Sequence, residues 1–379
     1  MIPLSIPQLG GNEWTYVKEC LDTGWVSSAG KFVGLFEERM LAYNGSAHAI
    51  ACMNGTAALH VSQLLLGVGP GDLVLAPNIT FVATLNAIAY TGAEAVLIDV
   101  DPANWQLDLN VLERFLKEEC DSSTAGELVH KADEKRIKAI MPVHVLGNIC
   151  NMDRLLSLCE TYGLPIVEDS TEALGSTYNG CHAGTFGTFG TSSFNGNKIM
   201  TTGGGGMIFT QDADLAARAK HLTTTAKTDP LDYFHDETGY NYRLVNVLAA
   251  MGVAQLEQFP GFLAAKKKMD AFYRQELAGV GDVRFQEITE GVDPNCWLFT
   301  FRTARMRELL TYLNANGVQS RPFWAPMNQL PMYAGWRYYH QEDNSSLLHA
   351  EAISIPSSSG ITVKQMTEVV EKIKAFYQG

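Results

Sequence analysis

A single lysine stands inside a glycine-rich stretch of the chain. Lys198 is followed by apolar and hydroxyl side chains at 199–202 and then by the four glycines 203–206. Apolar neighbours can remove an ammonium group from water, which lowers its pKa, and the free amine can form a Schiff base with an aldehyde or ketone. This chemistry suggests pyridoxal phosphate. The alternative is a glycine-rich turn that carries a solvated lysine.

The glycines themselves do not follow a nucleotide-binding pattern. Gly184, Gly187 and Gly190 lie three residues apart, which differs from GxGxxG, and the motif GxxxxGK[ST] is absent. Glycine permits close approach of another group and costs conformational entropy. We therefore expect some other group to pack against the backbone of residues 184–206.

A second candidate is a turn that could bind phosphate. Residues 49–53 form an apolar run that predicts a short strand, and Asn54, Gly55 and Thr56 open a predicted helix. The first N–H groups of a helix and the positive end of its dipole bind anions. Many turns between a strand and a helix have this composition without binding phosphate, so both interpretations stay open.

Two further candidates stand where predicted strands end. Asp169 follows the apolar run 164–167, where it could cap the next helix or hold the pyridine nitrogen of a cofactor protonated. Phe81 follows the run 73–76 and could be a core residue or stack on the ring. His144 stands at the end of a third run. Because ligands collect beyond the carboxyl ends of parallel strands, we expect all three side chains at one edge of the sheet.

The elements that must position these residues alternate along the chain. Short apolar runs separated by helical segments predict an α/β fold, with a parallel sheet and helices on both faces. A predicted helix at 246–258 ends near Pro260, and we place a domain boundary there. The predicted domains are residues 1–258 and a smaller α+β domain, 259–379.

Three polar or aromatic segments interrupt this alternation. Residues 118–138 have mixed charge and predict a surface excursion, whereas 223–238 predict a mobile or intersubunit loop. Residues 321–340 are crowded with aromatic side chains and prolines. They could line a pocket or pack on the large domain.

Composition excludes several classes of protein. A chain of 379 residues with 46% hydrophobic and 18% charged residues is typical of a globular enzyme or binding protein of two domains. The net charge of −13 disfavours nucleic acid and polybasic membrane contact. There is no uninterrupted apolar run of 18 residues and no signal peptide, so we expect a cytoplasmic protein. The seven cysteines are scattered without a CxxC pair, which predicts neither a disulfide framework nor a metal site.

Taken together, these segments resemble the DegT/DnrJ/EryC1/StrS family of pyridoxal-phosphate-dependent sugar aminotransferases. The resemblance covers essentially the whole chain and is carried by NGTAAL (54–59), PNITFVATLNAI (77–88), VEDSTEALGS (167–176), SFNGNKIMTTGGGGM (193–207) and GYNYRLVNVLAAMGVAQLE (239–257). It implies a fold-type I enzyme with a large α/β/α domain, a mostly parallel sheet and a small C-terminal α+β domain.

The resemblance also implies roles for individual residues. Lys198 would be the catalytic residue that bonds pyridoxal 5'-phosphate, Asp169 would pair with the pyridine nitrogen, and Phe81 would stack on the ring. The phosphate would bind the amides of Thr56 and Ala57, the hydroxyl of Ser193 and, in the neighbouring subunit of a homodimer with shared sites, Asn241. Glu172 occupies the position that would contact the ring hydroxyl, where relatives often have His or Gln.

The implied reaction moves an amino group from L-glutamate to C4 of a nucleotide-linked 4-keto-6-deoxy sugar. The insertion after Phe115 resembles the subgroup that aminates UDP-linked N-acetyl sugars of the legionaminic acid type, for surface polysaccharide (lipopolysaccharide) or nonulosonate synthesis. GDP- or dTDP-linked keto sugars, aminated at C4 or C3, are the alternative substrates. A non-catalytic sugar-binding relative is the other alternative, although it would be expected to lose Lys198 or Asp169. Met327 and Asn328 replace the PxH pattern common in the family, which removes a histidine contact to substrate.

Overall fold

A mostly parallel sheet forms the centre of the larger lobe. The structure is a computed structural model that describes residues 1–229 and 231–378. Within these ranges, two four-stranded sheets are joined by parallel bridges from Ile140 to Ile166 and from Val143 to Asp169. The strands stand in the order β18 (Arg337–Tyr339), β3 (Glu94–Ile98), β2 (Leu73–Pro77), β6 (Ile137–Ile140), β7 (Val167–Asp169), β10 (Phe189–Ser193), β11 (Gly206–Thr210) and β1 (His48–Cys52). In this sheet β11 runs antiparallel to both neighbours and the other pairings between strands are parallel.

Both faces of this sheet are covered by helices, because successive side chains on a strand point to opposite faces. On β2, Val74 and Ala76 pack with the helices of one face, while Leu73 and Leu75 pack with those of the other. The first face is covered by α3 (Gly55–Leu65), α4 (Ala83–Tyr90) and α7 (Ala213–Thr223), and the second by α5 (Leu109–Glu118) and α6 (Met152–Tyr162). The predicted α/β/α layering is confirmed.

Short polar side chains cap four of these helices, whereas α4 begins after Val82 without a side-chain cap. Asn54 accepts a hydrogen bond from the Ala57 amide at the start of α3 (2.7 Å). Asp108, Asn151 and Asp212 do the same for the first turns of α5, α6 and α7. Each such cap typically contributes about 1 kcal/mol of stability.

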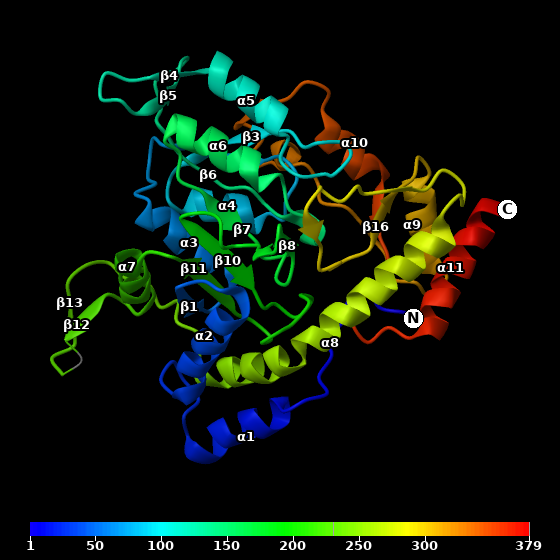
Figure 1. Cartoon of the computed structure of the whole chain (residues 1–379), viewed down its shortest axis with the longest axis horizontal. Coiled ribbons are helices and arrows are strands. Elements are labelled where there is room, and N and C mark those ends of the chain that lie inside the picture. Colours follow the sequence, from blue (N-terminus) through cyan, green and yellow to red (C-terminus); the bar gives the residue numbers. More distant parts are fainter. Residues whose placement is uncertain (230, 379) are drawn as a thin grey trace.

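The helix that was predicted to stop near Pro260 continues through it, so the predicted helix end is wrong. Helix α8 runs from Asn246 to Leu277, about 48 Å at 1.5 Å per residue, and links the two lobes (Figure 1). A proline inside a helix removes one backbone hydrogen bond. Here, Phe259 and Phe262 on either side of Pro260 are buried in the core, and Phe259 packs edge-on against Tyr43 (5.2 Å between ring centroids). Packing of these rings outweighs the local cost of the proline.

Helix α8 packs most closely against two N-terminal helices, α1 (Glu13–Thr23) and α2 (Lys31–Asn44). Among the described residues it is also the one helix whose length and composition would allow it to cross a membrane. Half of its most apolar stretch is buried inside the protein, as is found in the core helices of soluble proteins.

The smaller lobe is an antiparallel sheet covered by helices, so the predicted α+β character is confirmed. Its strands pair in the order β14 (Arg284–Phe285), β16 (Thr300–Arg302), β19 (Ala352–Ser354) and β17 (Arg321–Pro322). Its core includes side chains from the second half of α8, α9 (Met306–Ala315) and α11 (Val363–Gln378). Helix α10 (Asn344–Glu351) and the short helix η2 (Met327–Gln329) lie between these elements along the chain.

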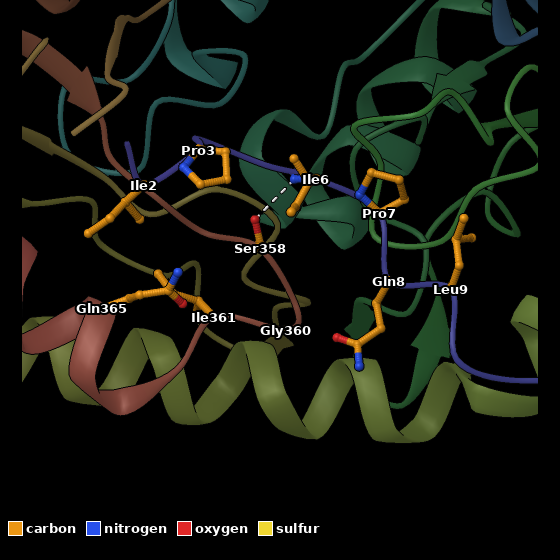
Figure 2. A pocket seen from close by; sticks show the side chains of 10 residues that line it. All are labelled: Ile2, Pro3, Ile6, Pro7, Gln8, Leu9, Ser358, Gly360, Ile361 and Gln365. Atoms are coloured by element: carbon orange, nitrogen blue, oxygen red, sulfur yellow. Dashed lines mark hydrogen bonds between the residues drawn. The ribbon is translucent and has the colours of Figure 1, made fainter. Parts of the chain in front are cut away.

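Two segments cross between the lobes. The chain beyond residue 258 returns to the large sheet through β18, which pairs with β3, so residues 321–340 both line a pocket and pack on the large lobe. Residues 2–9, here called the N-terminal strap, run the other way: Ile2 bridges to Val318, and Ile6 donates to Ser358 Oγ (3.0 Å). Figure 2 shows the groove of about 320 Å³ between the strap and the segment before α11. The division into domains at 258/259 stays a prediction.

The two polar segments of the large lobe form hairpins. Residues 118–138 contain β4 (Cys120–Ser122) and β5 (Leu128–His130), and 223–238 contain β12 (Lys227–Asp229) and β13 (Phe234–His235), with residue 230 outside the described range. Short strands β8 (Thr177–Tyr178), β9 (Cys181–His182) and β15 (Val292–Asp293) form a small sheet, and η1 (Val145–Gly147) follows β6.

Candidate active site

A cavity of about 780 Å³ lies at the carboxyl ends of β2 and β7 and is closed on the other side by the smaller lobe. Six of the eight sequence-predicted residues line this cavity, and Ala57 is adjacent to one of them, Thr56. These seven residues are spread over 142 positions between Thr56 and Lys198. The lining residues used below are Asn54, Gly55, Thr56, Phe81, Thr84, Asp169, Thr171, Glu172, Ser193, Asn197, Lys198, Trp297, Arg321, Trp324 and His349. The topology therefore assembles the site at the sheet edge where it was expected.

Lys198 lies in the connection between β10 and β11 and reaches into the cavity. Its Nζ is 4.0 Å from Glu172 Oε1 and 4.3 Å from the centroid of the Trp297 ring. Burial lowers the pKa of the Lys198 amine, and the carboxylates of Glu172 and Asp169 oppose that shift. An amine held in this way is more easily deprotonated than a solvated lysine and can act as a nucleophile. The interpretation as a solvated turn lysine is wrong.

Asp169 ends β7 and is held by hydroxyl and amide donors. Thr84 Oγ1 donates to Oδ2 (2.7 Å), while Thr171 donates to Oδ1 through both its amide (3.2 Å) and its hydroxyl (2.7 Å). The carboxylate is 3% exposed and lines the cavity. These donors stabilise a negative charge in a buried place where a cationic ring nitrogen could meet it.

Glu172 lies one turn beyond Asp169 and is also buried. The Leu146 amide of η1 donates to Oε2 (2.8 Å). Burial raises the pKa of Glu172 to about 7, against the opposing effects of Lys198 and the Leu146 amide. A carboxyl group with this pKa can exchange a proton near neutral pH.

The predicted phosphate turn is present, but one of its two amides is occupied. Gly55 and Thr56 line the cavity at the N-terminus of α3, with Ser193 beside them. The Ala57 amide, in contrast, donates to its own cap, Asn54, so its predicted contact to the phosphate is not available in this structure. The Asn54 cap is a local pattern, and the N-cap rule could have found it from the sequence.

Close approach explains several of the glycines, and the group that packs against them is the chain itself. A Cβ on Gly206 would lie 2.4 Å from the backbone carbonyl atoms of Asn54 and 2.6 Å from the Gly55 nitrogen. A Cβ on Gly190 would lie 2.0 Å from the Gly184 oxygen. Gly206 therefore allows β11 to run against the start of α3, which places the phosphate turn beside the Lys198 connection.

Phe81 is not a core residue. Its side chain is 52% exposed at the mouth of the cavity, and its ring meets Trp324 of the smaller lobe edge-on (5.7 Å between centroids). One ring face is thus free to cover a planar ligand. The predicted stacking role stays a prediction.

Asn241 does not line the cavity of its own chain. It is exposed and pairs with Thr224 through a backbone bridge. This position is compatible with a role in a neighbouring subunit, which stays a prediction.

A buried acid that sequence reasoning missed holds the glycine-rich segment in place. Glu168 is fully buried and accepts hydrogen bonds from the amides of Gly184 (2.9 Å), Phe186 and Gly187 (both 2.7 Å). Its Oε2 also lies 3.1 Å from His144 Nε2. His144, which was expected at the ligand edge, is therefore behind the cavity wall. The sequence could have indicated this second role for an acid, because Glu168 and Asp169 are adjacent at the end of a strand and neighbouring side chains on a strand point to opposite faces.

Trp297 is the other missed residue, and it covers Lys198 from the smaller lobe. Its indole N–H donates to the carbonyl oxygen of Asn197 (2.8 Å), the residue before the lysine. Its own carbonyl accepts a hydrogen bond from Lys266 Nζ (2.7 Å), and Lys266 is buried on α8 and also donates to Ser357 O. These contacts join residues 31 to 100 positions apart, and no local pattern predicts them.

The cavity fits pyridoxal phosphate on several independent grounds. The N-terminus of α3 presents backbone amides at the cavity, where they can bind an anion, and Gly55 lets it pack closely on the cavity wall, since a Cβ there would lie 2.9 Å from Ser193 Cβ and 3.2 Å from Thr171 Cγ2. Across the cavity stand a buried carboxylate, Asp169, and a buried amine, Lys198. This fold and this site together define a fold-type I, pyridoxal-phosphate-dependent aminotransferase.

Comparison with known proteins identifies the family. The chain belongs to the DegT/DnrJ/EryC1/StrS aminotransferase family, whose family model matches residues 7–374. A protein of Caulobacter vibrioides named GDP-perosamine synthase is 38% identical over 97% of this chain and 96% of its own length. One of the same name from Escherichia coli O157:H7 is 35% identical over 99% and 98%. A crystal structure of a DegT DnrJ EryC1 StrS aminotransferase from Brucella abortus, 26% identical, superposes with a TM-score of 0.89 over 97% of this chain and 96% of that one.

These relatives correct one expectation from the sequence. The resemblance to the subgroup that aminates UDP-linked N-acetyl sugars is not supported, because both relatives carry names of GDP-linked products. Part of the insertion on which that expectation depended forms the β4/β5 hairpin, and no residue of that hairpin lines the cavity.

Proposed function

We propose that this sugar aminotransferase moves the amino group of L-glutamate to a keto carbon, C4, of a GDP-linked sugar, leaving 2-oxoglutarate. The choice of a GDP-linked substrate rests on one observation, the two GDP-perosamine synthases whose sequences match almost the whole chain. The product would serve surface polysaccharide synthesis, including lipopolysaccharide, and we expect the reaction to occur in the cytoplasm.

The geometry supports a division of work among the site residues. Pyridoxal phosphate, when bound, supplies an electrophilic aldehyde and a ring that accepts electrons. Lys198 would bond to it and move the proton at the reacting carbon. Asp169 would place its charge at the ring nitrogen, and Phe81 would cover a ring face. The phosphate would lie at the amides of Gly55 and Thr56 and the hydroxyl of Ser193.

A cationic side chain on the cavity wall formed by the smaller lobe suits an anionic substrate. Arg321 of β17 lines the cavity, donates to the carbonyl oxygen of Ser320 (2.9 Å) and forms no ion pair within the described ranges. His349 of α10 lines the same wall. A guanidinium group binds phosphate oxygens in a bidentate manner. We propose that Arg321 contacts the diphosphate of the nucleotide sugar.

Exposed apolar side chains support a homodimer with shared sites. Large apolar side chains remain exposed on and just after α1 (Trp14, Leu21 and Trp25) and on the β12/β13 hairpin (Tyr233 and Phe234). Met53, Phe81 and Tyr90 of the large lobe are exposed as well. Clusters of this kind mark interaction surfaces. A twofold dimer would cover them and bring a partner's Asn241 segment toward the cavity.

The substrate is tested with a panel of 4-keto-6-deoxy sugars linked to GDP, UDP or dTDP, each with L-glutamate and the cofactor. We expect the amino sugar to form fastest with the GDP-linked substrate, as followed by mass spectrometry. Lys198→Ala is the control for background reaction and should form no product over many turnovers.

Two results would contradict the proposal in different ways. Preference for a UDP- or dTDP-linked sugar would overturn the proposal that the nucleotide is GDP. Normal turnover of the GDP-linked sugar by Arg321→Ala, with unchanged KM, would remove Arg321 from the substrate site.

A further inference from the structure

The two acids that face the cavity are held differently. Asp169 receives three hydrogen bonds, from Thr84 and from both donors of Thr171. Glu172 receives one, from the Leu146 amide to Oε2. Its other oxygen, Oε1, is directed to the Lys198 amine at 4.0 Å. Differences of this kind between paired acids separate a fixed charge from a group that exchanges protons.

The Glu172 and Lys198 side chains are enclosed together. Their exposed fractions are 2% and 11%, and the Trp297 ring covers the amine on one side. A separation of 4.0 Å is too long for a direct hydrogen bond, but a rotation of the flexible lysine or one water molecule would close it. In such a place a pair of ions and a pair of neutral groups can be close in free energy, because burial penalises both charges.

We propose that Glu172 is the proton-exchange partner of Lys198. The Lys198 ammonium gives its proton to the Glu172 carboxylate, which leaves a neutral amine and a carboxylic acid, and the reverse transfer restores the two ions. One N–H bond breaks as one O–H bond forms, so the step needs no other reactant. The exchange between Glu172 and Lys198 is a property of the chain alone. Only its use in moving a proton of the substrate rests on the proposed function.

Other charged groups face the same space. The charge of Asp169 on β7 raises the pKa of both Glu172 and Lys198, while Arg321 on β17 and His349 on α10 line the wall from the smaller lobe. Behind Glu172, His144 is engaged with Glu168. Burial shifts the pKa of Glu172 upward and that of Lys198 downward, toward each other, which is what an exchange between them requires.

The test measures the pH dependence of Lys198 acylation by acetic anhydride in the full-length chain after removal of the cofactor. Peptide mass spectrometry reports labelling of Lys198 itself. Two groups that share protons titrate in two coupled steps. We expect two steps for the parent chain and a single step for Glu172→Gln. The upper midpoint should move to lower pH by about 1 unit or more, because a carboxylate at this distance no longer favours the ammonium form.

Variants make the result specific. Glu172→Gln keeps an acceptor for the Leu146 amide, and Glu172→Asp keeps a titrating group and should retain two steps. Glu113→Gln is the matched control, since Glu113 is a half-buried acid on α5 that lies outside the cavity, and this variant should behave as the parent does. In the loaded enzyme, Glu172→Gln should change the pH profile of kcat with little change in the KM for the sugar.

A single titration step in the parent chain would overturn the proposal, and this outcome needs no variant to fold. Unchanged labelling in a folded Glu172→Gln would overturn it as well. Because labelling uses neither glutamate nor a sugar, failure to aminate any GDP-linked sugar would overturn the proposed function and leave this result standing.

Discussion

Two adjacent acids at the end of β7 do different work. Glu168 points behind the sheet edge, where it binds three amides of the 184–187 turn, and Asp169 points into the cavity. The alternation of side chains along a strand separates them. One acid thus holds the glycine-rich segment while its neighbour lines the cavity.

The charge of Asp169 is testable without changing its shape. Asp169→Asn should keep the fold but weaken the electron-accepting power of a bound cofactor, because the ring nitrogen loses its anionic partner. We expect turnover to fall by several orders of magnitude, with an unchanged circular dichroism spectrum. A loss below about tenfold, or roughly 1.4 kcal/mol in barrier, would contradict the assigned role.

Lys266 offers a prediction of pH-dependent stability. Burial lowers its pKa to about 7, from an ordinary value of 10.5. Between these values the unfolded chain binds more protons at this residue than the folded chain does, so the free energy of unfolding should rise with pH. The contribution of this one group is at most about 1.4 kcal/mol per pH unit.

Lys266→Met should remove that rise, as measured by urea unfolding between pH 7 and pH 10. The matched control is Lys267→Met, since Lys267 is exposed and pairs with Asp293 at the surface. If the two variants showed the same dependence on pH, the buried amine would not be its source.

At the scale of elements, the site depends on how closely β11 approaches the N-terminus of α3. The strand runs against the backbone of Asn54 and Gly55 because Gly206 has no side chain. This contact holds the phosphate turn beside the strand that follows the Lys198 connection. The density of glycine in this stretch therefore serves packing of the chain on itself.

Gly206→Ala should separate these two elements. The added Cβ would meet backbone atoms at 2.4 to 2.6 Å, which cannot rotate away, so strand and helix must shift. Overpacking of this kind costs about 1–3 kcal/mol. We expect a lower unfolding midpoint and weaker retention of pyridoxal phosphate, measured by visible absorbance after gel filtration.

Gly204→Ala is the control, two residues away, because nothing lies within 4 Å of its Cβ position. Equal losses in both variants would mean that glycine flexibility, and not the close contact, matters in this run.

At the scale of the molecule, the cavity depends on both lobes and, we propose, on a second subunit. The large lobe provides the phosphate turn, Asp169 and Lys198, while the smaller lobe adds Trp297 and Arg321. Helix α8 and the N-terminal strap connect the lobes. Asn241 is exposed and does not line the cavity of its own chain.

Mixed dimers test the shared site. A Lys198→Ala chain and an Asn241→Asp chain should each be nearly inactive, the second because a carboxylate repels the phosphate. Refolded together, they should regain activity, because one site of each mixed dimer contains neither lesion. Mixed dimers that form and stay as inactive as the parents would place Asn241 within its own subunit or outside the site.

The sequence by itself determined the fold class and indicated six of the residues that line the cavity, namely Thr56, Phe81, Asp169, Glu172, Ser193 and Lys198. Lys198, Asp169 and the Asn54 to Thr56 turn each stand in a local pattern whose cause is also local: a glycine-rich connection, the end of an apolar strand, a helix N-terminus. Parallel strands then bring such ends to one edge of the sheet, whatever their separation along the chain.

Only the tertiary structure decided the features that depend on distant contacts. Helix α8 passes through Pro260 because buried rings on both sides outweigh one lost hydrogen bond, and β18 joins the large sheet across the predicted boundary. Trp297 covers Lys198 from about 100 residues away, and the free oxygen of Glu172 meets the amine in an enclosed space. Propensity and spacing act over a few residues, whereas burial energy acts on whatever the fold places side by side.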